Sequence, residues 1–382
     1  MKRPIVSFFV HDLASNPIVR AAPLARALSA THDVEILGFL LSGDEVYAPY
    51  RHLFTYKAMR SSRSVAAIAA AIPALAAQAT GDVIYACKPL VTTLVPALIA
   101  ARAGNHRLLL DAEDDEWVPL GTGWPQFLWR DVVRGWHHAT AWKYTRGVHP
   151  LVWTADGVTV SSRRLQHRYG GMLLRHGPDE RLFDPDRPEL RDWRACRARF
   201  GLPDDAPIAL FAGVPQPHKG WSVLLEALNR REAAAWHLAI AGPINDPEFV
   251  RAGETLGTRC HDLGPQSHDA MPALLAAIDA VPVPQLRCVF AESQIPAKAI
   301  EAMAMAKPVI ASSVGDLSEI LGHGTRGWVI APDNAADLAR ALAEIARDRG
   351  EAARRGAAAR DWFVREASTA AMRARLEPLL AA

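Results

Sequence analysis

Residues 207–228 read PIALFAGVPQPHKGWSVLLEAL, which places a short apolar run, a glycine-containing loop and an amphipathic stretch in direct succession. The run at 207–213 is typical of a buried strand, and the apolar residues after Gly220 recur at helical spacing. Similar successions occur along the rest of the chain, so we expect βαβ units and parallel sheets covered by helices on both faces. The sequence therefore predicts an α/β fold.

The strand candidates fall into two series. The first series contains 4–10, 34–40, 82–87, 106–112 and 157–162, and the second contains 172–177, 207–213, 236–242, 280–284 and 308–313. Because 382 residues exceed what one hydrophobic core usually supports, we expect two domains. The stretch between the two series is rich in Pro, Asp and Arg, as is common in an exposed connection.

Composition excludes several classes of protein. The net charge is +2, with 22% charged and 50% hydrophobic residues, so a sizeable core can form and no bulk attraction to nucleic acid is expected. The four cysteines are scattered without a CxxC pair, and no secretory leader precedes the first predicted strand, which indicates a reducing cytoplasm. Because no HExxH or Cys/His spacing is present, we expect no metal site.

In doubly wound sheets the ligand crevice lies outside the carboxyl ends of the strands, so the loops after the strands are the places to search. Gly213 and Lys219 lie in the loop after 207–213, just before a predicted helix. The free amides of a helix N-terminus and a lysine charge together suit a phosphate group. The alternative is a solvated lysine in a turn.

A second candidate lies in AESQIPAKAIE at 291–301, where Lys298 and Glu301 are three residues apart on a helix that we expect to start near Pro296. The turn of Ser293, Gln294 and Ile295 before it would present amides to an anion, and Glu301 could accept hydrogen bonds from a diol such as ribose. The alternative is an ordinary ion pair on a helix surface, worth about 0.3–0.5 kcal/mol.

DAEDDEW at 111–117 concentrates five acids in six residues directly after a predicted strand. Glu113 and Asp114 are its candidates for orienting sugar hydroxyls, serving as a general base or binding a cation. The alternative is a solvated acidic loop.

The stretch 124–153 combines tryptophans with basic residues. This composition fits either a peripheral membrane contact or an aromatic stripe that faces the core.

Taken together, four segments resemble retaining glycosyltransferases of family 4, also called glycosyl transferases group 1. The segments are GVTVSSRRLQHRYG with RHGPDERLFDP, FAGVPQPHKGWSVLLEAL, HDLGPQSHDAMPALLAAIDAVPVPQ and IPAKAIEAMAMAKPVIASSVGDLSEIL. The resemblance implies a GT-B fold, in which two Rossmann-like doubly wound domains face a central cleft. It places an acceptor domain at 1–170, a donor domain at 171–363, and a C-terminal helix at about 364–382 packed back on the acceptor domain.

The resemblance also implies the activity, which is transfer of a sugar from a UDP- or GDP-linked donor to an acceptor hydroxyl with retention at the anomeric carbon. The acceptor would be a sugar, a lipid-linked molecule or a small molecule, and no cofactor or metal is expected. Lys219 would contact the donor phosphates and Glu301 the ribose, with catalytic roles for both. The protein would be cytoplasmic, with a peripheral contact at the inner face of the cell membrane if 124–153 binds lipid.

Departures from the family pattern set the remaining expectations. The family's first glutamate would fall at Ser293, with Glu292 one residue out of register. Either the loop bulges to bring Glu292 round, or Ser293 and Gln294 face the donor, which we favour because Pro296 fixes the helix start.

The first domain lacks the family's usual glycine-rich loop and histidine. The candidates there for acceptor contacts are therefore His11, Asn16 and Arg20, together with Glu113 and Asp114.

Two rival functions remain open. One is a nucleotide-sugar epimerase or a sugar phosphorylase on the same architecture. Another is a membrane-surface or carbohydrate-binding protein built on a degenerate transferase. A nicotinamide dehydrogenase is disfavoured, since FFVHDLASNP at 8–17 lacks a GxGxxG motif.

Overall fold

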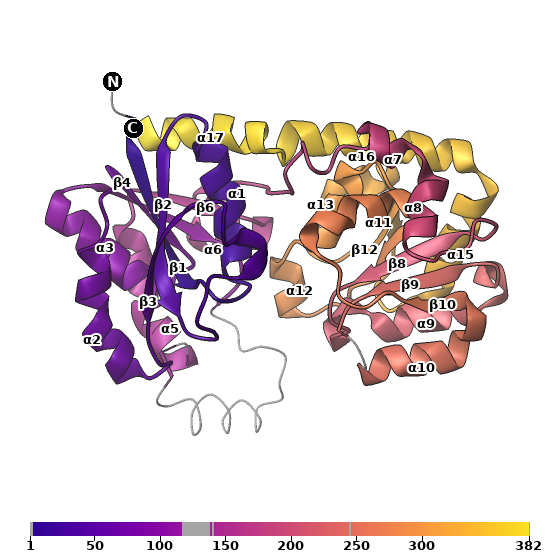
Figure 1. Cartoon of the computed structure of the whole chain (residues 1–382), viewed down its shortest axis with the longest axis horizontal. Helices are drawn as coiled ribbons and strands as arrows, with labels where there is room; N and C mark the ends of the chain where they lie inside the picture. Colours follow the sequence, from indigo (N-terminus) through magenta and orange to yellow (C-terminus); the bar gives the residue numbers. More distant parts are fainter. Residues whose placement is uncertain (1–2, 117–137, 140, 244–245, 382) are drawn as a thin grey trace. The chain divides into compact units, whose positions relative to one another are not determined.

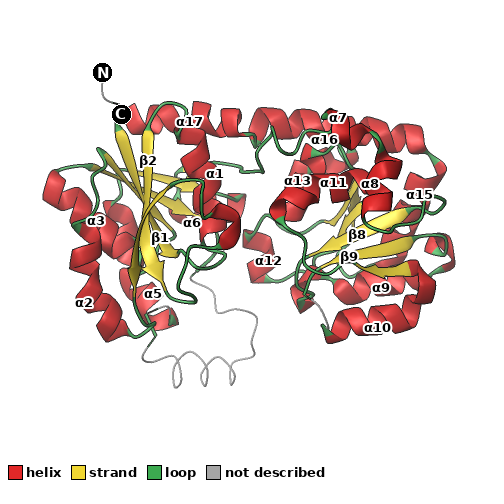
Figure 2. Cartoon of the chain, viewed as in Figure 1, coloured by secondary structure: helices red, strands yellow, loops and turns green. Residues whose placement is uncertain are grey.

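The computed structural model of the chain describes residues 3–116, 138–139, 141–243 and 246–381. Contacts divide the chain into two compact units, the first made of Met1–His176 with Thr369–Ala382 and the second of Gly177–Ser368. The sequence analysis placed the corresponding boundaries at 170/171 and about 363/364. In each unit, helices flank a parallel sheet (Figure 2).

The described residues of the first unit form a seven-stranded sheet with strand order β3-β2-β1-β4-β5-β6-β7. Its strands are β1 (Ile5–Asp12), β2 (Asp33–Leu40), β3 (Thr55–Arg60), β4 (Val83–Cys87), β5 (Arg107–Ala112), β6 (Gly157–Val160) and β7 (Met172–Leu173). The order runs outward from β1 in one direction and outward from β4 in the other. The neighbouring pair β1 and β4 is therefore the point at which the strand order reverses.

Helices cover both faces of the first sheet (Figure 1). They are α1 (Ile18–Leu28), α2 (Val65–Ala76), α3 (Leu94–Gly104), α5 (Trp142–Val148), α6 (Arg163–Tyr169) and α17 (Thr369–Ala381). Successive side chains of a strand point to opposite faces, and the buried neighbours Phe8 and Phe9 accordingly belong to different cores. Phe8 packs with residues of α1 and α17, and Phe9 packs with residues of α2 and α3.

The second unit repeats this plan. Its strands are β8 (Ile208–Ala212), β9 (His237–Ala241), β10 (Cys260–Asp262), β11 (Val281–Val283), β12 (Val309–Ser312) and β13 (Trp328–Ile330). They form the groups β10-β9-β8 and β11-β12-β13. A parallel bridge between Ala209 and Ala280 joins β8 to the residue just before β11, where the Leu210 amide donates to the Ala280 carbonyl at 3.0 Å. The order again reverses between two neighbours, here β8 and β11.

The helices of the second unit also lie on both faces of its sheet. They are α7 (Pro188–Arg191), α8 (Trp193–Arg199), α9 (Trp221–Asn229), α10 (Pro247–Leu256), α11 (Met271–Ala277), α12 (Val289–Ser293), α13 (Ala297–Ala304), α14 (Leu317–Ile320), α15 (Ala335–Arg347) and α16 (Arg349–Glu366). The core on one face joins the sheet to α9, α10 and α15, and the core on the other face joins it to α11, α13 and α16. None of the helices in the described part of the chain has the length and hydrophobicity that crossing a membrane requires.

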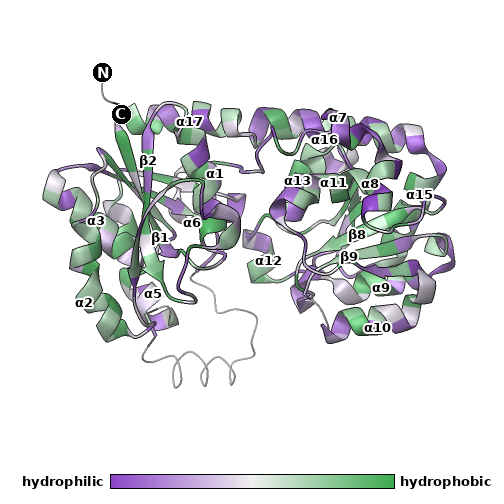
Figure 3. Ribbon diagram, in the orientation of Figure 1, coloured by the Kyte–Doolittle hydropathy of each residue, from purple (hydrophilic) through white to green (hydrophobic). Residues whose placement is uncertain are grey.

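All ten predicted strands are present, but the strand at 172–177, which we assigned to the second series, is β7 of the first sheet, where it pairs with β6. The sequence analysis missed β3, β10 and β13. Each of these three is the edge strand of its group. Hydrophobic residues concentrate along the central strands (Figure 3), whereas β3 reads TYKAMR and β10 reads CHD. The polar residues of β3 and β10 break the apolar pattern, and β13 is apolar but only three residues long, so the sequence signal of all three strands is weak.

Arg20 differs from its predicted role as an acceptor contact. It lies on α1, and its side chain is fully buried together with that of Asp111 on β5. Its Nε and Nη2 donate to the two Asp111 carboxylate oxygens at 2.9 and 2.7 Å, and the Thr159 hydroxyl donates to the same carboxylate at 2.6 Å. Arg20 therefore ties α1 to the sheet through Nε and Nη2, whereas its buried Nη1 has no hydrogen-bond partner among the described residues.

The Arg20–Asp111 pair gives a stability prediction. Substituting Arg20→Met should lower the free energy of unfolding by about 3–5 kcal/mol, because it leaves the buried Asp111 charge without a partner. The measurement is urea unfolding, and adding Asp111→Leu to Arg20→Met should recover part of the loss. As a control, Arg60→Met removes an exposed pair with Asp44 and should change stability by less than about 1 kcal/mol. Equal losses from Arg20→Met and Arg60→Met would contradict this account.

Candidate functional site

The strand-order reversal of the second unit brings two loops together. The loop 213–220 follows β8, and residues 284–288 follow β11 before α12 begins. The Leu286 amide donates to the His218 carbonyl at 2.9 Å, so the two loops are hydrogen-bonded to each other. Parallel sheets bind ligands at this position, because the loops on either side of the reversal leave room between them.

Gly220 lets the two loops approach closely. Its φ of +67° lies in the left-handed region, and a Cβ at this position would lie 1.7 Å from the Pro284 carbonyl oxygen. Any side chain here would force the loops apart. The backbone therefore requires glycine at position 220, directly after Lys219.

Three basic side chains, those of His218, Lys219 and Lys298, lie beside this contact. Lys219 Nζ donates to the Val214 carbonyl at 2.9 Å and lies close to Gly213. Lys298, on the first turn of α13, places its Nζ 4.2 Å from the centre of the Phe211 ring. Although part of the Lys298 stem is exposed, its Nζ is buried and has no hydrogen-bond partner among the described residues.

All three basic groups have a lowered pKa, and burial is the largest cause in each case. Burial, followed by the charge of Lys219, lowers the pKa of Lys298 to about 7. Burial also lowers the pKa of Lys219, and burial followed by the two lysine charges lowers the pKa of His218. No carboxylate contributes to any of these shifts, so the cluster has the electrostatics of a site that an anion would complete.

Glu301 lies one helical turn after Lys298 on α13. The two side chains do not form an ion pair within 4 Å in the described structure, so the alternative of a helix-surface ion pair does not hold. Burial raises the pKa of Glu301 to about 7. Its carboxyl group is free to accept hydrogen bonds from a ligand.

The turn before α13 differs from the prediction. Ser293 is fully buried, and its hydroxyl donates to the carbonyls of Val289 and Phe290 at 3.2 and 2.9 Å. Its side chain is therefore engaged within α12, and the expectation that it faces the donor does not fit. Ile295 belongs to the hydrophobic core, whereas Gln294 is partly exposed.

Glu292, the alternative to Ser293, forms an ion pair with Arg287 at 3.2 Å. The acid that stands one residue out of register is thus held by the segment just before α12, and this structure assigns it no place beside Glu301.

The first unit gathers charged groups at its own strand-order reversal. His11 lies near the end of β1, Lys88 directly follows β4, and Glu113 and Asp114 follow β5. Lys88 Nζ lies 2.5 Å from Asp114 Oδ2, 3.0 Å from Glu116 Oε1 and 3.8 Å from Glu113 Oε2. The structure thus brings three of the predicted site residues together around a lysine that the sequence analysis did not single out.

Burial sets the protonation of two of these groups. It lowers the pKa of His11 to about 4, with the nearby Lys88 charge acting in the same direction, and Nδ1 of His11 lies 2.7 Å from the Thr92 hydroxyl. Burial and the neighbouring Asp114 raise the pKa of Glu113 to about 7, against the opposing effect of Lys88. Asn16 is exposed in the loop between β1 and α1.

Sequence reasoning missed Lys88 and His218. Lys88 directly follows β4, and His218 lies in the loop after β8, so both lie at the carboxyl end of a strand that flanks a reversal. This position in the sheet is the signal that could have identified them. The strand order itself cannot be read from a single sequence, so the signal needs the topology.

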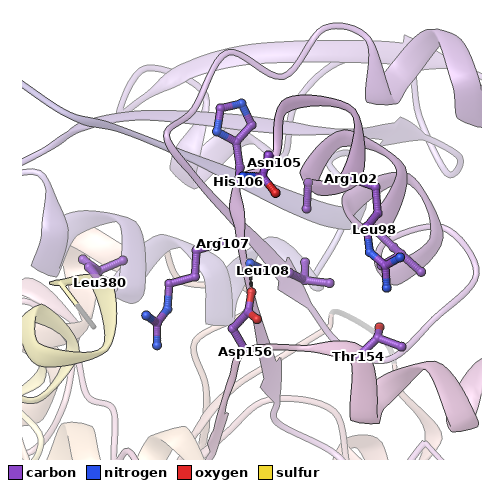
Figure 4. A pocket seen from close by; sticks show the side chains of 10 residues that line it. Leu98, Arg102, Asn105, His106, Arg107, Leu108, Thr154, Asp156 and Leu380 are labelled. Carbon is purple, nitrogen blue, oxygen red and sulfur yellow. Dashed lines mark hydrogen bonds between the residues drawn. The ribbon is translucent and has the colours of Figure 1, made fainter.

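Two cavities lie away from these loops. One, of about 700 Å³, is lined at the amino end of β5 by Arg102, His106, Arg107 and Asp156, among others (Figure 4). The Leu108 amide donates to Asp156 at 2.8 Å, so this carboxylate serves the strand. The other, of about 450 Å³, lies at the amino end of β8 and includes Lys307.

The predicted membrane contact at 124–153 falls largely on residues 117–137 and 140, which lie outside the described residues, so it stays a prediction. Among the described side chains, no group of three or more His, Cys, Asp or Glu residues is arranged to hold a metal ion.

The fold defines the class of protein first. A glycosyltransferase from Rickettsia africae superimposes with a TM-score of 0.74 at 18% identity, over 99% of this chain and 98% of that chain. The Anabaena protein Alr3699/HepE in complex with UDP and glucose gives a TM-score of 0.73 at 17% identity, over 100% of both chains. The architecture is therefore GT-B, with two Rossmann-like α/β units.

The family follows from the sequence of the second unit. Residues 194–362 match the family described as Glycosyl transferases group 1, so the second unit contains a domain of this family. A D-inositol 3-phosphate glycosyltransferase of Stackebrandtia nassauensis is 32% identical over 203 residues, which are 50% of this chain and 44% of that protein. The 2-deoxystreptamine glucosyltransferase of Streptomyces kanamyceticus is 29% identical over 241 residues, or 57% of this chain and 60% of that protein. The chain spans about half the length of these curated relatives.

Lys298 and Lys307 form a matched pair for a stability test, since both are buried lysines of the second unit with a lowered pKa. Lys307 Nζ donates to the carbonyls of Ala276 and Ile278, whereas Lys298 Nζ has no such partner. At pH 7, Lys298→Met should raise the free energy of unfolding by about 1–2 kcal/mol, and Lys307→Met should lower it by about 1–3 kcal/mol. Chemical unfolding of the ligand-free proteins measures both.

The pH dependence provides a check on the Lys298 prediction. The pKa of Lys298 is about 7 in the folded state, against 10.5 for an exposed lysine, so unfolding takes up a proton between these values. The contribution of Lys298 to the free energy of unfolding therefore rises with pH across that window. Lys298→Met should make the stability of the protein less dependent on pH there. A destabilised Lys298→Met variant with an unchanged slope would contradict the assignment.

Proposed function

We propose that the protein is a retaining glycosyltransferase that moves a sugar from a nucleoside diphosphate sugar to an acceptor hydroxyl. The observation that carries the proposal is the buried, unpartnered Nζ of Lys298 beside Lys219, at the strand-order reversal of the unit that matches the family. A diphosphate supplies the negative charge that this cluster lacks. The UDP and glucose bound by the structurally similar HepE protein support a donor of this class.

The donor is assigned to the second unit. Lys219 and Lys298 contact its phosphates, and the carboxyl group of Glu301 accepts hydrogen bonds from the ribose hydroxyls. Gly213 and Gly220 allow the backbone to come close to the diphosphate. Because Lys298 is only half protonated near neutral pH, donor binding takes up part of a proton as the phosphates raise its pKa.

Catalysis follows from charge development. As the bond between the sugar and the phosphate oxygen breaks, negative charge accumulates on the leaving diphosphate, and two lysines held in place before the reaction stabilise it without a metal. A departing phosphate oxygen takes the acceptor's proton on the same face of the sugar, which accounts for retention without a carboxylate nucleophile.

The acceptor is assigned to the first unit, at the carboxyl ends of β1, β4 and β5. Carboxylates there suit a molecule that presents several hydroxyl groups, because each carboxylate oxygen accepts hydrogen bonds. The curated relatives act on D-inositol 3-phosphate and 2-deoxystreptamine, and these names support a hydroxylated ring as the acceptor class. A lipid-linked acceptor and a peripheral membrane contact through 124–153 remain predictions.

Direct binding tests the proposal. UDP or GDP should bind the purified protein and raise its apparent thermal stability, because a ligand that binds only the folded state shifts the unfolding equilibrium. Lys219→Ala and Lys298→Met should each weaken nucleotide binding by about tenfold or more, since each removes a charge-assisted contact to phosphate. Calorimetry measures the affinities.

Lys307→Met is the matched control, because it removes a buried lysine of the same unit that lies away from the loops. It should lower stability without changing nucleotide affinity. If the wild-type protein binds no nucleoside diphosphate and releases none from a panel of nucleotide sugars, the proposed function is wrong.

A further inference from the structure

Lys88 has a backbone conformation that lysine rarely adopts. Its φ of +76° lies in the left-handed region, which costs a residue with a side chain on the order of 1–3 kcal/mol. Two hydrogen bonds hold it there: its amide donates to the Asp111 carbonyl at 2.8 Å, and its carbonyl accepts from the Thr93 hydroxyl at 2.5 Å. Glycine would adopt this conformation freely, so the local backbone alone does not explain a lysine here.

The Lys88 side chain is enclosed by carboxylates. It is 14% exposed, and its Nζ donates to Asp114 Oδ2 and Glu116 Oε1, with Glu113 Oε2 slightly farther away. The strained backbone therefore aims an ammonium group into the acids that follow the neighbouring strand β5. Because β1 and β4 flank the strand-order reversal, this cluster lies where the first sheet would bind a ligand.

One carboxylate oxygen of this cluster is unsatisfied. Asp114 Oδ2 accepts from Lys88, but Asp114 Oδ1 is buried and has no hydrogen-bond partner among the described residues. A buried acceptor without a donor costs about 1–3 kcal/mol. A hydroxyl group of a ligand would supply the missing donor.

We propose that Lys88 is a positioning residue for the acceptor, which fixes Asp114 and Glu113 so that their carboxylates accept hydrogen bonds from acceptor hydroxyls. The inference rests on the proposed function, since it names the groups that hold that reaction's second substrate. Lys88 itself touches no substrate. It orients Asp114 through Oδ2, leaves Oδ1 to accept a hydrogen bond from the ligand, and supplies positive charge that favours the ionised form of Glu113.

Several charged groups surround Glu113. Asp114 and Asp111 oppose its ionisation, whereas Lys88 and Arg20, on the element packed against β5, favour it. His11 faces Lys88 from β1 and is neutral at pH 7, because burial lowers its pKa to about 4. Removing Lys88 takes away the larger of the two favourable charges. The pKa of Glu113 then rises further above its ordinary value, and less of the residue is ionised at pH 7.

The test compares Lys88→Met with Lys88→Arg in the full-length protein. The readouts are the pH profile of kcat/KM for the acceptor, the affinity for UDP, and the carboxyl-carbon NMR titration of Glu113. In Lys88→Met, the acidic limb of the profile and the Glu113 titration should both move up by about one pH unit. The ionised fraction of Glu113 at pH 7 falls from about one half to about one tenth when its pKa rises by one unit from about 7, so the acceptor kcat/KM at pH 7 should fall about fivefold. UDP affinity should not change, and Lys88→Arg should keep the limb near its wild-type position.

Lys57→Met is the matched control, since it removes a lysine bonded to Glu35 elsewhere in the same sheet. It should lower stability and leave the acidic limb in place. A limb and a Glu113 titration that do not move in Lys88→Met would overturn the inference, as would a Lys88→Arg profile like that of Lys88→Met.

A second variant covers the case in which Lys88→Met does not fold. Glu113→Gln should then abolish the acidic limb, and a limb that persists in Glu113→Gln would equally overturn the inference. If the wild-type protein does not bind UDP, the result counts against the proposed function. A failure of the proposed function can therefore be told apart from a failure of the Lys88 inference.

Discussion

The buried ammonium group of Lys298 is the constraint on which the account of the second unit depends. Burying a cation is costly unless a partner compensates it, and the neighbouring Lys219 increases that cost. Two backbone carbonyls compensate the buried charge of Lys307, and the Asp111 carboxylate forms two hydrogen bonds with the buried guanidinium of Arg20. Among the described residues, Lys298 Nζ has no hydrogen-bond partner and lies 4.2 Å from the centre of the Phe211 ring. The ligand-free protein thus tolerates an electrostatic cost that an anionic ligand would remove.

Both units place an unusual lysine after a strand that flanks the strand-order reversal, directly after β4 in the first unit and on α13 in the second. Lys88 follows β4 beside β1, and Lys298 lies beyond β11 beside β8, so each flanks the strand-order reversal of its sheet. Their surroundings differ in sign. Carboxylates enclose Lys88, whereas basic groups surround Lys298. On this contrast in charge we propose that the first unit binds acceptor hydroxyl groups and the second unit binds the diphosphate of the donor.

The sequence predicted the α/β architecture and its central strands because buried parallel strands produce continuous apolar runs. It failed at β3 and β10, which carry no such run, and at β13, which is apolar but only three residues long. For the candidate site, the sequence singled out Lys219 by its place in a loop and Lys298 and Glu301 by their place at a helix start, and the structure brings the two lysines close together, while the roles of all three residues stay predictions. Ser293 could not, because its hydroxyl turns back to the carbonyls of its own helix, and a sequence pattern does not show that orientation. The same limit applies to Arg20, whose partner Asp111 is distant in sequence.

The central claim is that Lys298 binds the diphosphate of the donor, and that its side chain is about half protonated near neutral pH when no donor is bound. The most direct measurement is an NMR titration of the Lys298 side chain with and without UDP. The account predicts a pKa of about 7 in the free protein and an increase of about 1–3 units when UDP binds, because an opposite charge at close range favours the protonated form. A Lys298 pKa that stays the same in the UDP complex would contradict it.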